Sequence, residues 1–297
     1  MADIVHVGEG LPHCPHLSVT MDAQNSQGEL QRALEQLPPE IHRKMLPSSR
    51  TIVLRVTSKT IRTAVEKADA VVQAQNGYQF PDVRGLLEKL RGLSVWCKVT
   101  VLRLKDCRLG RTGASEDIAS LLSEHLVELD LQGNDIQEYG GRLLAETLCL
   151  NTALKSLNLG RNGLGEGGGR ALAAKLCLNT ALTELNLWGN DLGEGGGRAL
   201  SDTLRLNTTL TSLQLDGNHL GEGGGGALAD SLRFNTTLTS LQLFDNHLGE
   251  GSVWVLEKTL RLNTALTKLD LLHNCLGGEQ QSALHQAWGD RGGSLLV

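Results

Sequence analysis

The side chains of this sequence that are best placed for chemistry are those that could bind another protein. The chain has 297 residues, and only four Trp, two Tyr and three Phe are among them. Trp188, Phe244 and Leu272 stand at the ends of short strand-like runs, where side chains of that parity should face water. Large apolar residues gathered on one exposed face are typical of interfaces, and charged neighbours can supply polar partners. The candidate partner-binding residues are Arg161, Trp188, Gln214, Asp216, Phe244, Asp245 and Leu272.

The sequence offers no comparable set for catalysis. No Ser/His/Asp or Cys/His combination lies where a fold of this pattern would bring its members together. The run L-G-E-G-G-G-R, at 164–170 and 192–198, resembles a phosphate-binding loop, but no GK[ST] follows and the run is repeated. His13, Cys14 and His16 lack a second ligand pair at a zinc spacing. We therefore predict no enzyme activity, no metal and no cofactor.

The elements that position the candidate residues are repeats with a 28-residue step. A fixed period in this range predicts a solenoid. Each copy opens with L-x-L, which indicates a strand of about five residues, and a Gly-rich turn then leads to a helix such as RALSDTLRL. Strands paired with wider helices should bend the array into an arc, with the strands on its concave face. Copies begin at Leu126, Leu154, Leu182, Leu210, Leu238 and Leu266, and a shorter copy begins at Val99.

Two columns of asparagine recur with the same step. In the first column an amide can satisfy backbone groups where the strand turns away, and Cys107 takes the same place in the first copy. This structural ladder comprises Asn134, Asn162, Asn190, Asn218, Asn246 and Asn274. The second column follows each helix, where Asn tolerates the left-handed conformation that ends a helix. It comprises Asn151, Asn179, Asn207, Asn235 and Asn263.

The consensus L-x-x-L-x-L-x-x-N-x-L with a long helical half resembles the ribonuclease-inhibitor-like class of leucine-rich repeats, which also occurs in NOD-like receptors. The resemblance covers residues 99–293. It implies an α/β horseshoe solenoid that binds a protein on its concave face. The chain has one repeat length and six cysteines, so a nuclease-inhibiting role is not implied.

The N-terminal third lacks the repeat. Residues 1–27 have no periodicity, which predicts a flexible tail. Residues 28–98 predict a small helical module, with one helix running through 51–75. Within it, residues 37–65 resemble an F-box, and LRVTSKTIR matches the end of that motif except that Ile61 replaces the usual tryptophan. The module could therefore be only a cap for the first repeat, or it could also dock a ubiquitin-ligase adaptor. Residues 99–297 form the seven repeats and a C-terminal cap.

Charge and composition narrow the partner class. Residues 99–297 carry 16 Lys and Arg against 23 Asp and Glu, a net charge of −7, which argues against nucleic acid as a partner. No stretch has the length of a membrane span, and the first residues do not resemble a secretory leader. The cysteines do not fall into close pairs and indicate thiols in a reducing compartment. We therefore expect a cytoplasmic protein, with a nuclear location also open.

Three functions remain open at this level. The first is an intracellular scaffold that binds a protein partner on its concave face. The second is a substrate-recognition subunit of a ubiquitin ligase, with residues 37–65 on the adaptor. The third and most remote is a GTPase-activating protein, because the Ran GTPase-activating protein resembles this architecture and Arg108 or Arg111 would be the counterpart of its arginine by position.

Overall fold

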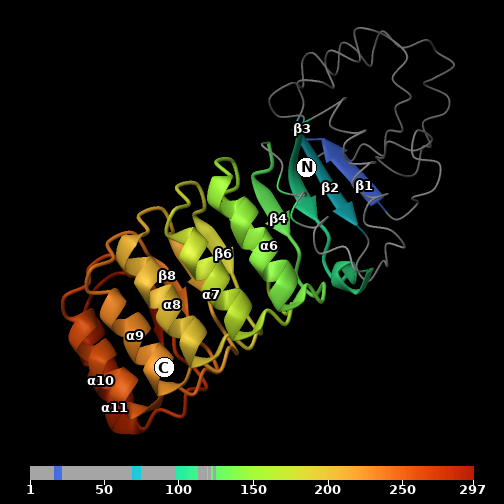
Figure 1. Ribbon diagram of the computed structural model, residues 1–297. Coiled ribbons are helices and arrows are strands. Elements are labelled where there is room, and N and C mark those ends of the chain that lie inside the picture. The colour runs from blue at the N-terminus through green and yellow to red at the C-terminus, as the bar shows by residue number, and fades with distance from the viewer. Residues whose placement is uncertain (1–16, 22–68, 75–97, 113–118, 120–121, 123–124) are drawn as a thin grey trace, which may run out of the picture.

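The strands of the protein form one sheet in chain order. The computed structural model describes residues 17–21, 69–74, 98–112, 119, 122 and 125–297. In these residues the sheet has ten strands, β1 to β10 (Figure 1). They are β1 (Leu17–Met21), β2 (Asp69–Ala74), β3 (Lys98–Arg103), β4 (Glu128–Asp130), β5 (Ser156–Asn158), β6 (Glu184–Asn186), β7 (Ser212–Gln214), β8 (Ser240–Gln242), β9 (Lys268–Asp270) and β10 (Ser294–Leu296).

A helical element lies between most of these strands. A 3₁₀ helix, η2 (Leu109–Thr112), follows β3. The α-helices of the repeats are α6 (Gln137–Leu150), α7 (Gly165–Leu176), α8 (Gly193–Leu206), α9 (Gly221–Ser231), α10 (Gly249–Leu260) and α11 (Gly278–Trp288).

Residues that pair between neighbouring strands from β4 to β9 are one repeat, 28 residues, apart in the sequence. Leu157 of β5 has Leu185 as its Cα partner, and Leu185 has Leu213, so equivalent residues of successive copies lie side by side. The strands from β2 to β10 are parallel, whereas β1 is antiparallel to β2. The predicted strand length of five residues is wrong for β4 to β9, which have three residues each. The chain leaves the extended conformation soon after the strand, as the positive φ of 63° at Gly189 illustrates.

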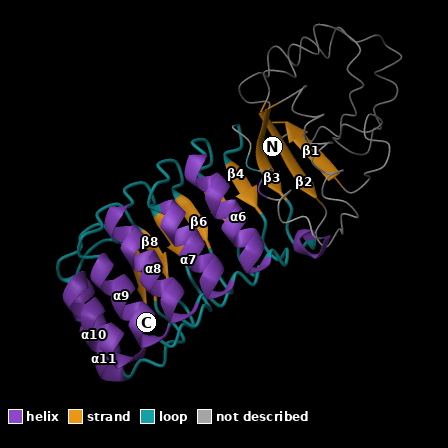
Figure 2. Ribbon diagram, in the orientation of Figure 1, coloured by secondary structure: helices purple, strands orange, loops and turns teal. Residues whose placement is uncertain are grey.

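Strands and helices occupy opposite sides of the array (Figure 2). Packed helices lie about 8–10 Å apart, whereas neighbouring strands lie about 4.8 Å apart. The helix side is therefore longer than the strand side, and the array must curve with its strands on the concave face. The α/β solenoid expected from the repeats is confirmed.

The core is a continuous stack of leucines between the two layers. In one repeat, Leu185 and Leu187 from the strand side meet Leu200 and Leu204 from α8, and all four are at most 2% exposed. At the C-terminal end Trp288 fills the place that leucine takes in earlier copies and is 6% exposed. Burial of apolar surface contributes about 25 cal/mol per Å² to the free energy of folding. The leucine contacts within and between neighbouring units therefore supply most of the stability of the solenoid.

The glycine-rich run that the sequence predicted as a turn forms the start of α7, α8 and α9. Helix α8 begins at Gly193, whose φ of 63° is left-handed. Farther along α8, a Cβ on Gly197 would lie 2.9 Å from the Cα of Gly224 in the next helix. Glycine is therefore needed where successive helices approach backbone to backbone, as expected for tight packing between units.

Two strands lie where the sequence predicted other structure. Strand β1 falls within residues 1–27, predicted to be a flexible tail, and β2 falls within 51–75, predicted to be a helix. Both contain β-branched residues, Val19 and Thr20 in β1 and Val71 and Val72 in β2, and the edge of β3 offers β2 a row of backbone partners. The rest of the predicted helical module, including the F-box-like segment 37–65, lies outside the described residues.

Candidate functional site

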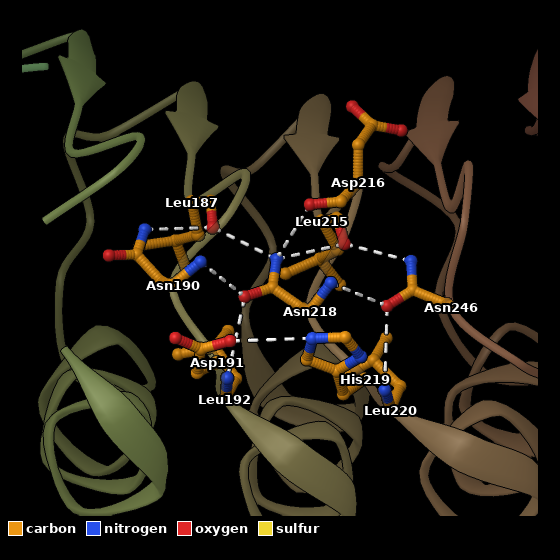
Figure 3. A network of polar contacts seen from close by, with 10 residues as sticks. All are labelled: Leu187, Asn190, Asp191, Leu192, Leu215, Asp216, Asn218, His219, Leu220 and Asn246. Carbon is orange, nitrogen blue, oxygen red and sulfur yellow. Dashed lines mark hydrogen bonds and ion pairs between the residues drawn. The ribbon is translucent and has the colours of Figure 1, made fainter. Parts of the chain in front are cut away.

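The first asparagine column is a hydrogen-bonded ladder that ties each unit to the next (Figure 3). Asn218 donates from Nδ2 to the carbonyl oxygens of Leu187 and Leu215, at 2.9 and 2.8 Å. Its Oδ1 accepts from the backbone N–H of Asn190 at 3.0 Å and of Leu192 at 3.4 Å. The same bonds recur along the column, and its members are at most 2% exposed: Asn134, Asn162, Asn190, Asn218, Asn246 and Asn274. The ladder holds the backbone rigid directly beneath the candidate residues.

Cys107 takes the place of asparagine at the start of this ladder. Its backbone N–H donates to Oδ1 of Asn134 at 2.9 Å, and its Sγ donates to the carbonyl oxygen of Lys105 at 3.3 Å. Burial raises the pKa of the Cys107 thiol to about 12. The thiol therefore stays protonated and serves as a structural donor.

The second asparagine column forms another ladder, for a different reason from the one predicted. Asn207 has a φ of −74°, so the left-handed backbone expected there is wrong. Its Nδ2 instead donates to the carbonyl oxygens of Leu176 and Asn179, at 2.9 and 3.2 Å. Its Oδ1 accepts from the N–H groups of Thr209 and Leu210. The bond to Leu176 satisfies a carbonyl that α7, the helix of the preceding unit, leaves open at its C-terminus.

Two rows of side chains run across the concave face. Equivalent residues of successive strands form each row, so neighbours in a row are about 4.8 Å apart along the sheet. The amide row is Asn186, Gln214 and Gln242, and the aromatic row is Trp188, Asp216, Phe244 and Leu272. The members of both rows are half-buried. The structure thus brings four of the seven predicted residues into one row and a fifth, Gln214, into the row beside it.

The two glutamines of the amide row have unused hydrogen-bonding groups. Asn186 accepts the N–H of Trp188 at its Oδ1 at 3.0 Å, which is the local bond that a short side chain makes. The longer side chains of Gln214 and Gln242 make no hydrogen bond to another described residue. Their amides are free to meet donors and acceptors from outside.

The two aromatic rings lean away from each other. The ring of Trp188 lies over Gly160, where a Cβ would come within 2.3 Å of the ring's Cδ1. The guanidinium of Arg161 stands 5.4 Å from the centre of the same ring. Phe244 leans toward the next unit, with its ring centroid 4.6 Å from that of His273. These contacts explain why both rings are half-buried where the sequence predicted side chains that face water.

Asp216 is the acidic centre of the aromatic row. Its Oδ1 accepts the backbone N–H of Phe244 at 2.9 Å, which fixes the direction of the carboxylate. Burial raises the pKa of the Asp216 carboxyl above its ordinary value, the bond from Phe244 opposes this, and the charge of Asp270 adds to the rise. No described Lys or Arg lies within ion-pair distance of Asp216. Figure 3 shows its carboxylate pointing away from the asparagine ladder.

The remaining candidates lie at the edge of the rows. Asp245 is exposed and has a φ of 54°, and Leu272 is half-buried with its N–H bonded to Oδ1 of Asp270 at 3.0 Å. His219 has its Nε2 3.4 Å from Oδ1 of Asp191 (Figure 3) and stacks on His247 with ring centroids 5.7 Å apart.

A shallow hollow of about 210 Å³ continues the concave surface toward β4. Polar side chains on its walls include those of Glu128, Ser156, Asn158 and Ser212, and Gln214 closes the end beside Asp216. The rows and the hollow together form a continuous track across several strands. Such a track can hold an extended chain segment along the long axis of the array.

A second apolar surface, not predicted from the sequence, lies at the C-terminal ends of the helices. Its five residues stand one position before the second asparagine column, so the 28-residue spacing was the signal that could have revealed them. They are between 57% and 82% exposed: Leu150, Leu178, Leu206, Phe234 and Leu262.

Metal binding and membrane insertion have no support in the described part of the chain. There, no three side chains of His, Cys, Asp or Glu gather closely enough to hold a metal ion, whereas His13, Cys14 and His16 lie outside it. Among the helices that the structure describes, none is both long and apolar enough to cross a membrane.

The repeats match a known family of sequences. Residues 122–145, 150–173, 178–201, 206–229 and 234–251 each match the model described as a leucine-rich repeat. Residues 122–251 therefore form a solenoid of leucine-rich repeats. The solenoid also matches the human protein "NACHT, LRR and PYD domains-containing protein 12", with 41% identity over 75 residues. That match spans 25% of this chain and only 7% of the human protein, so it supports the type of repeat and not a shared activity.

Three solved structures are similar to parts of the solenoid. The actin-binding site 2 of leiomodin-1 is 24% identical with a TM-score of 0.44, and the match covers 48% of this chain and 84% of that one. A Caenorhabditis elegans tropomodulin C-terminal domain is 15% identical with a TM-score of 0.43, and the match covers 48% of this chain and 90% of that one. The Legionella pneumophila leucine-rich repeat-containing protein LegL7 is 25% identical with a TM-score of 0.47, and the match covers 68% of this chain and 66% of that one.

Proposed function

We propose that the solenoid is a protein-interaction scaffold that binds a protein partner on its concave strand face. The observation that carries this proposal is the aromatic row. Two rings and a carboxylate without a described counter-ion sit there, half-buried, on a backbone that the asparagine ladder holds rigid. Aromatic residues on a preorganised surface lose little entropy when they bind, which is why they dominate interface energetics.

The test is affinity capture from a cell lysate with the full-length chain. Three forms serve as bait: the natural chain, Trp188→Ala plus Phe244→Ala, and the control Trp254→Ala. Trp254 is a matched control because it is 59% exposed on α10, on the opposite side of the array, where Nζ of Lys258 lies 3.3 Å from its ring centre. Circular dichroism of each bait verifies that it is folded.

A partner that is lost with the concave pair of changes and retained with Trp254→Ala supports the proposal. If every captured partner is still recovered with Trp188→Ala plus Phe244→Ala, the proposal is wrong. A partner lost with Trp254→Ala alone would identify the helix side of the array as the interface instead.

The ubiquitin-ligase alternative rests on the sequence of residues 37–65 and is tested separately. Removing residues 1–98 is a poor test, because it also removes β2 and leaves the edge of β3 unpaired. The full-length variant Leu37→Ala plus Pro38→Ala is the better bait. Recovery of a ligase adaptor that depends on these two residues would promote the alternative.

A further inference from the structure

We propose that the concave face recognises an extended segment of its partner by one arginine, whose guanidinium binds Asp216 in the gap between Trp188 and Phe244. This inference rests on the proposed function and names the chemistry of the partner. Three features of the gap favour an arginine: its charge, its hydrogen-bonding groups and its width.

The negative charge of the aspartates in and beside the gap favours the binding of a cation. Asp216 and Asp270 lie close enough for one charge to affect the other, and Asp245 lies at the edge of the same row. None of the three has a Lys or Arg within ion-pair distance among the residues that the structure describes. The charge of Lys268 lies close enough to lower the pKa of Asp216, but burial and Asp270 raise it. A half-buried carboxylate without a counter-ion is costly, and a cation from outside removes that cost.

The hydrogen-bonding groups of the gap favour arginine over lysine. Oδ1 of Asp216 accepts the N–H of Phe244, and the backbone of Asp216 itself also donates to the carboxylate. The carboxylate points away from the asparagine ladder (Figure 3), and a carboxylate has about four lone-pair sites, so it can accept further hydrogen bonds. The amides of Gln214 and Gln242 lie in the row beside it and have no described partner. A guanidinium has five donors in a planar fork, which suits several acceptors in one place, whereas an ammonium is a compact point charge with three.

The width of the gap suits the side chain of arginine. Trp188 and Phe244 are two strand positions apart, which is roughly 10 Å along the sheet. The Trp188 ring contacts Gly160 in the preceding unit and the Phe244 ring contacts His273 in the following unit, so we infer an opening over Asp216 with an aromatic ring on each side. The methylene stem of an arginine can lie against such walls while its head reaches the carboxylate. The hollow beside Gln214 then receives the neighbouring residues of the segment.

The experiment selects ligands from random sequences, so the partner need not be identified first. A displayed library of random nine-residue peptides is selected on the full-length chain, and the best binder is synthesised with Arg, Lys or the uncharged isostere citrulline at each enriched basic position. Binding is measured by fluorescence polarisation to the natural chain, to Asp216→Asn, to Trp188→Ala plus Phe244→Ala, and to the control Leu178→Ser. Leu178 is 62% exposed just after α7, on a different surface from the concave rows.

We expect enrichment of arginine. Citrulline in the peptide, or Asp216→Asn in the protein, should each weaken binding at least tenfold, and the two changes together should cost little more than either alone. Leu178→Ser should leave binding unchanged. Non-additivity of this kind identifies a direct contact and not a general loss of structure.

Two results would overturn the inference. Binders that depend on Trp188 and Phe244 but tolerate both citrulline and Asp216→Asn would leave the concave scaffold standing and remove the arginine. Binders that ignore the concave variants, or a selection that yields none, would remove the arginine site as well. The capture experiment then decides the scaffold function on its own.

Discussion

The asparagine at each strand exit is the residue that the repeat depends on most. Asn218 donates to a buried carbonyl oxygen of the preceding unit and to one of its own unit, and it accepts two backbone N–H groups of the preceding unit. Each buried group left without a partner costs about 1–3 kcal/mol. A single residue of this column therefore contributes more than its own packing.

We predict that Asn218→Ala lowers the free energy of unfolding by about 2–4 kcal/mol, because several buried backbone groups lose their partner at once. Urea unfolding followed by circular dichroism measures the change. Thr236→Ala serves as the control, since Thr236 is exposed, and it should change stability by less than about 0.5 kcal/mol. Equal effects of the two changes would refute the role given to the ladder.

Asp216 should be a residue that binding needs and stability does not. Its pKa is raised in the folded protein, so the folded state holds the proton more tightly than the unfolded state does. Stability from this group is therefore greatest at low pH and is lost as the pH rises through the raised pKa. We predict that Asp216→Asn raises the melting temperature at pH 7 and that this gain shrinks toward about pH 4, near the ordinary carboxyl pKa. Differential scanning calorimetry at both pH values measures it, and a lower melting temperature at pH 7 would contradict the prediction.

At the scale of the strands and helices, the length of each strand and the packing of each helix depend on contacts between successive units. The sequence predicted the period, the strand and helix of each unit, and the structural ladder, because residues such as Leu185, Leu200 and Asn190 recur in step and their neighbours are copies of themselves. It did not predict the strand length or the bonds of Asn207. Both depend on contacts between units, which periodicity alone does not describe.

Close helix packing makes a direct prediction at Gly197. We expect Gly197→Ala to lower the free energy of unfolding by about 1–3 kcal/mol, because its Cβ would meet the backbone of Gly224 at 2.9 Å. The matched control is Gly278→Ala at the start of α11, where a Cβ would meet nothing within 4 Å. The control should be neutral or stabilising by up to about 1 kcal/mol. Thermal unfolding of both variants decides, and a neutral Gly197→Ala would count against the packing argument.

Arg291 ends the second ladder where the next asparagine would stand. Its Nη1 donates to the carbonyl oxygen of Asn263 at 2.7 Å, and its Nη2 donates to that of Leu260. The guanidinium also lies 4.8 Å from the ring centre of Trp288. Arg291 stands 28 residues after Asn263, which is the position of the next asparagine in the second column. The sequence analysis missed its role because the residue there is arginine and not asparagine.

We predict that Arg291→Ala destabilises the C-terminal unit by about 1–3 kcal/mol, because helix carbonyls lose charged donors. Hydrogen exchange across α11 and β10 measures the loss locally. Arg261→Ala is the control, since its exposed ion pair with Glu257 is worth less than about 1 kcal/mol. Unchanged exchange in Arg291→Ala would mean that Trp288 alone closes the core.

At the scale of the whole molecule, the repeat fixes a curved and rigid concave surface, and the side chains that vary between repeats give it its chemistry. The sequence predicted the members of the aromatic row from their parity in the strand. It could not predict that Trp188 lies over Gly160 or that Phe244 turns toward His273, because both depend on the neighbouring unit. The same holds for β1 and β2, which extend the sheet beyond the first repeat from a part of the chain without the repeat pattern.

The central claim is that a protein partner lies on the concave face, and site-specific photo-cross-linking in lysate tests it most directly. A photoreactive phenylalanine analogue is placed at Gln242 in one full-length protein and at Trp254 in another. We predict a discrete covalent adduct with another protein from position 242, which weakens when Asp216→Asn is added, and none from position 254. Adducts from position 254 alone, with none from 242, would contradict the account.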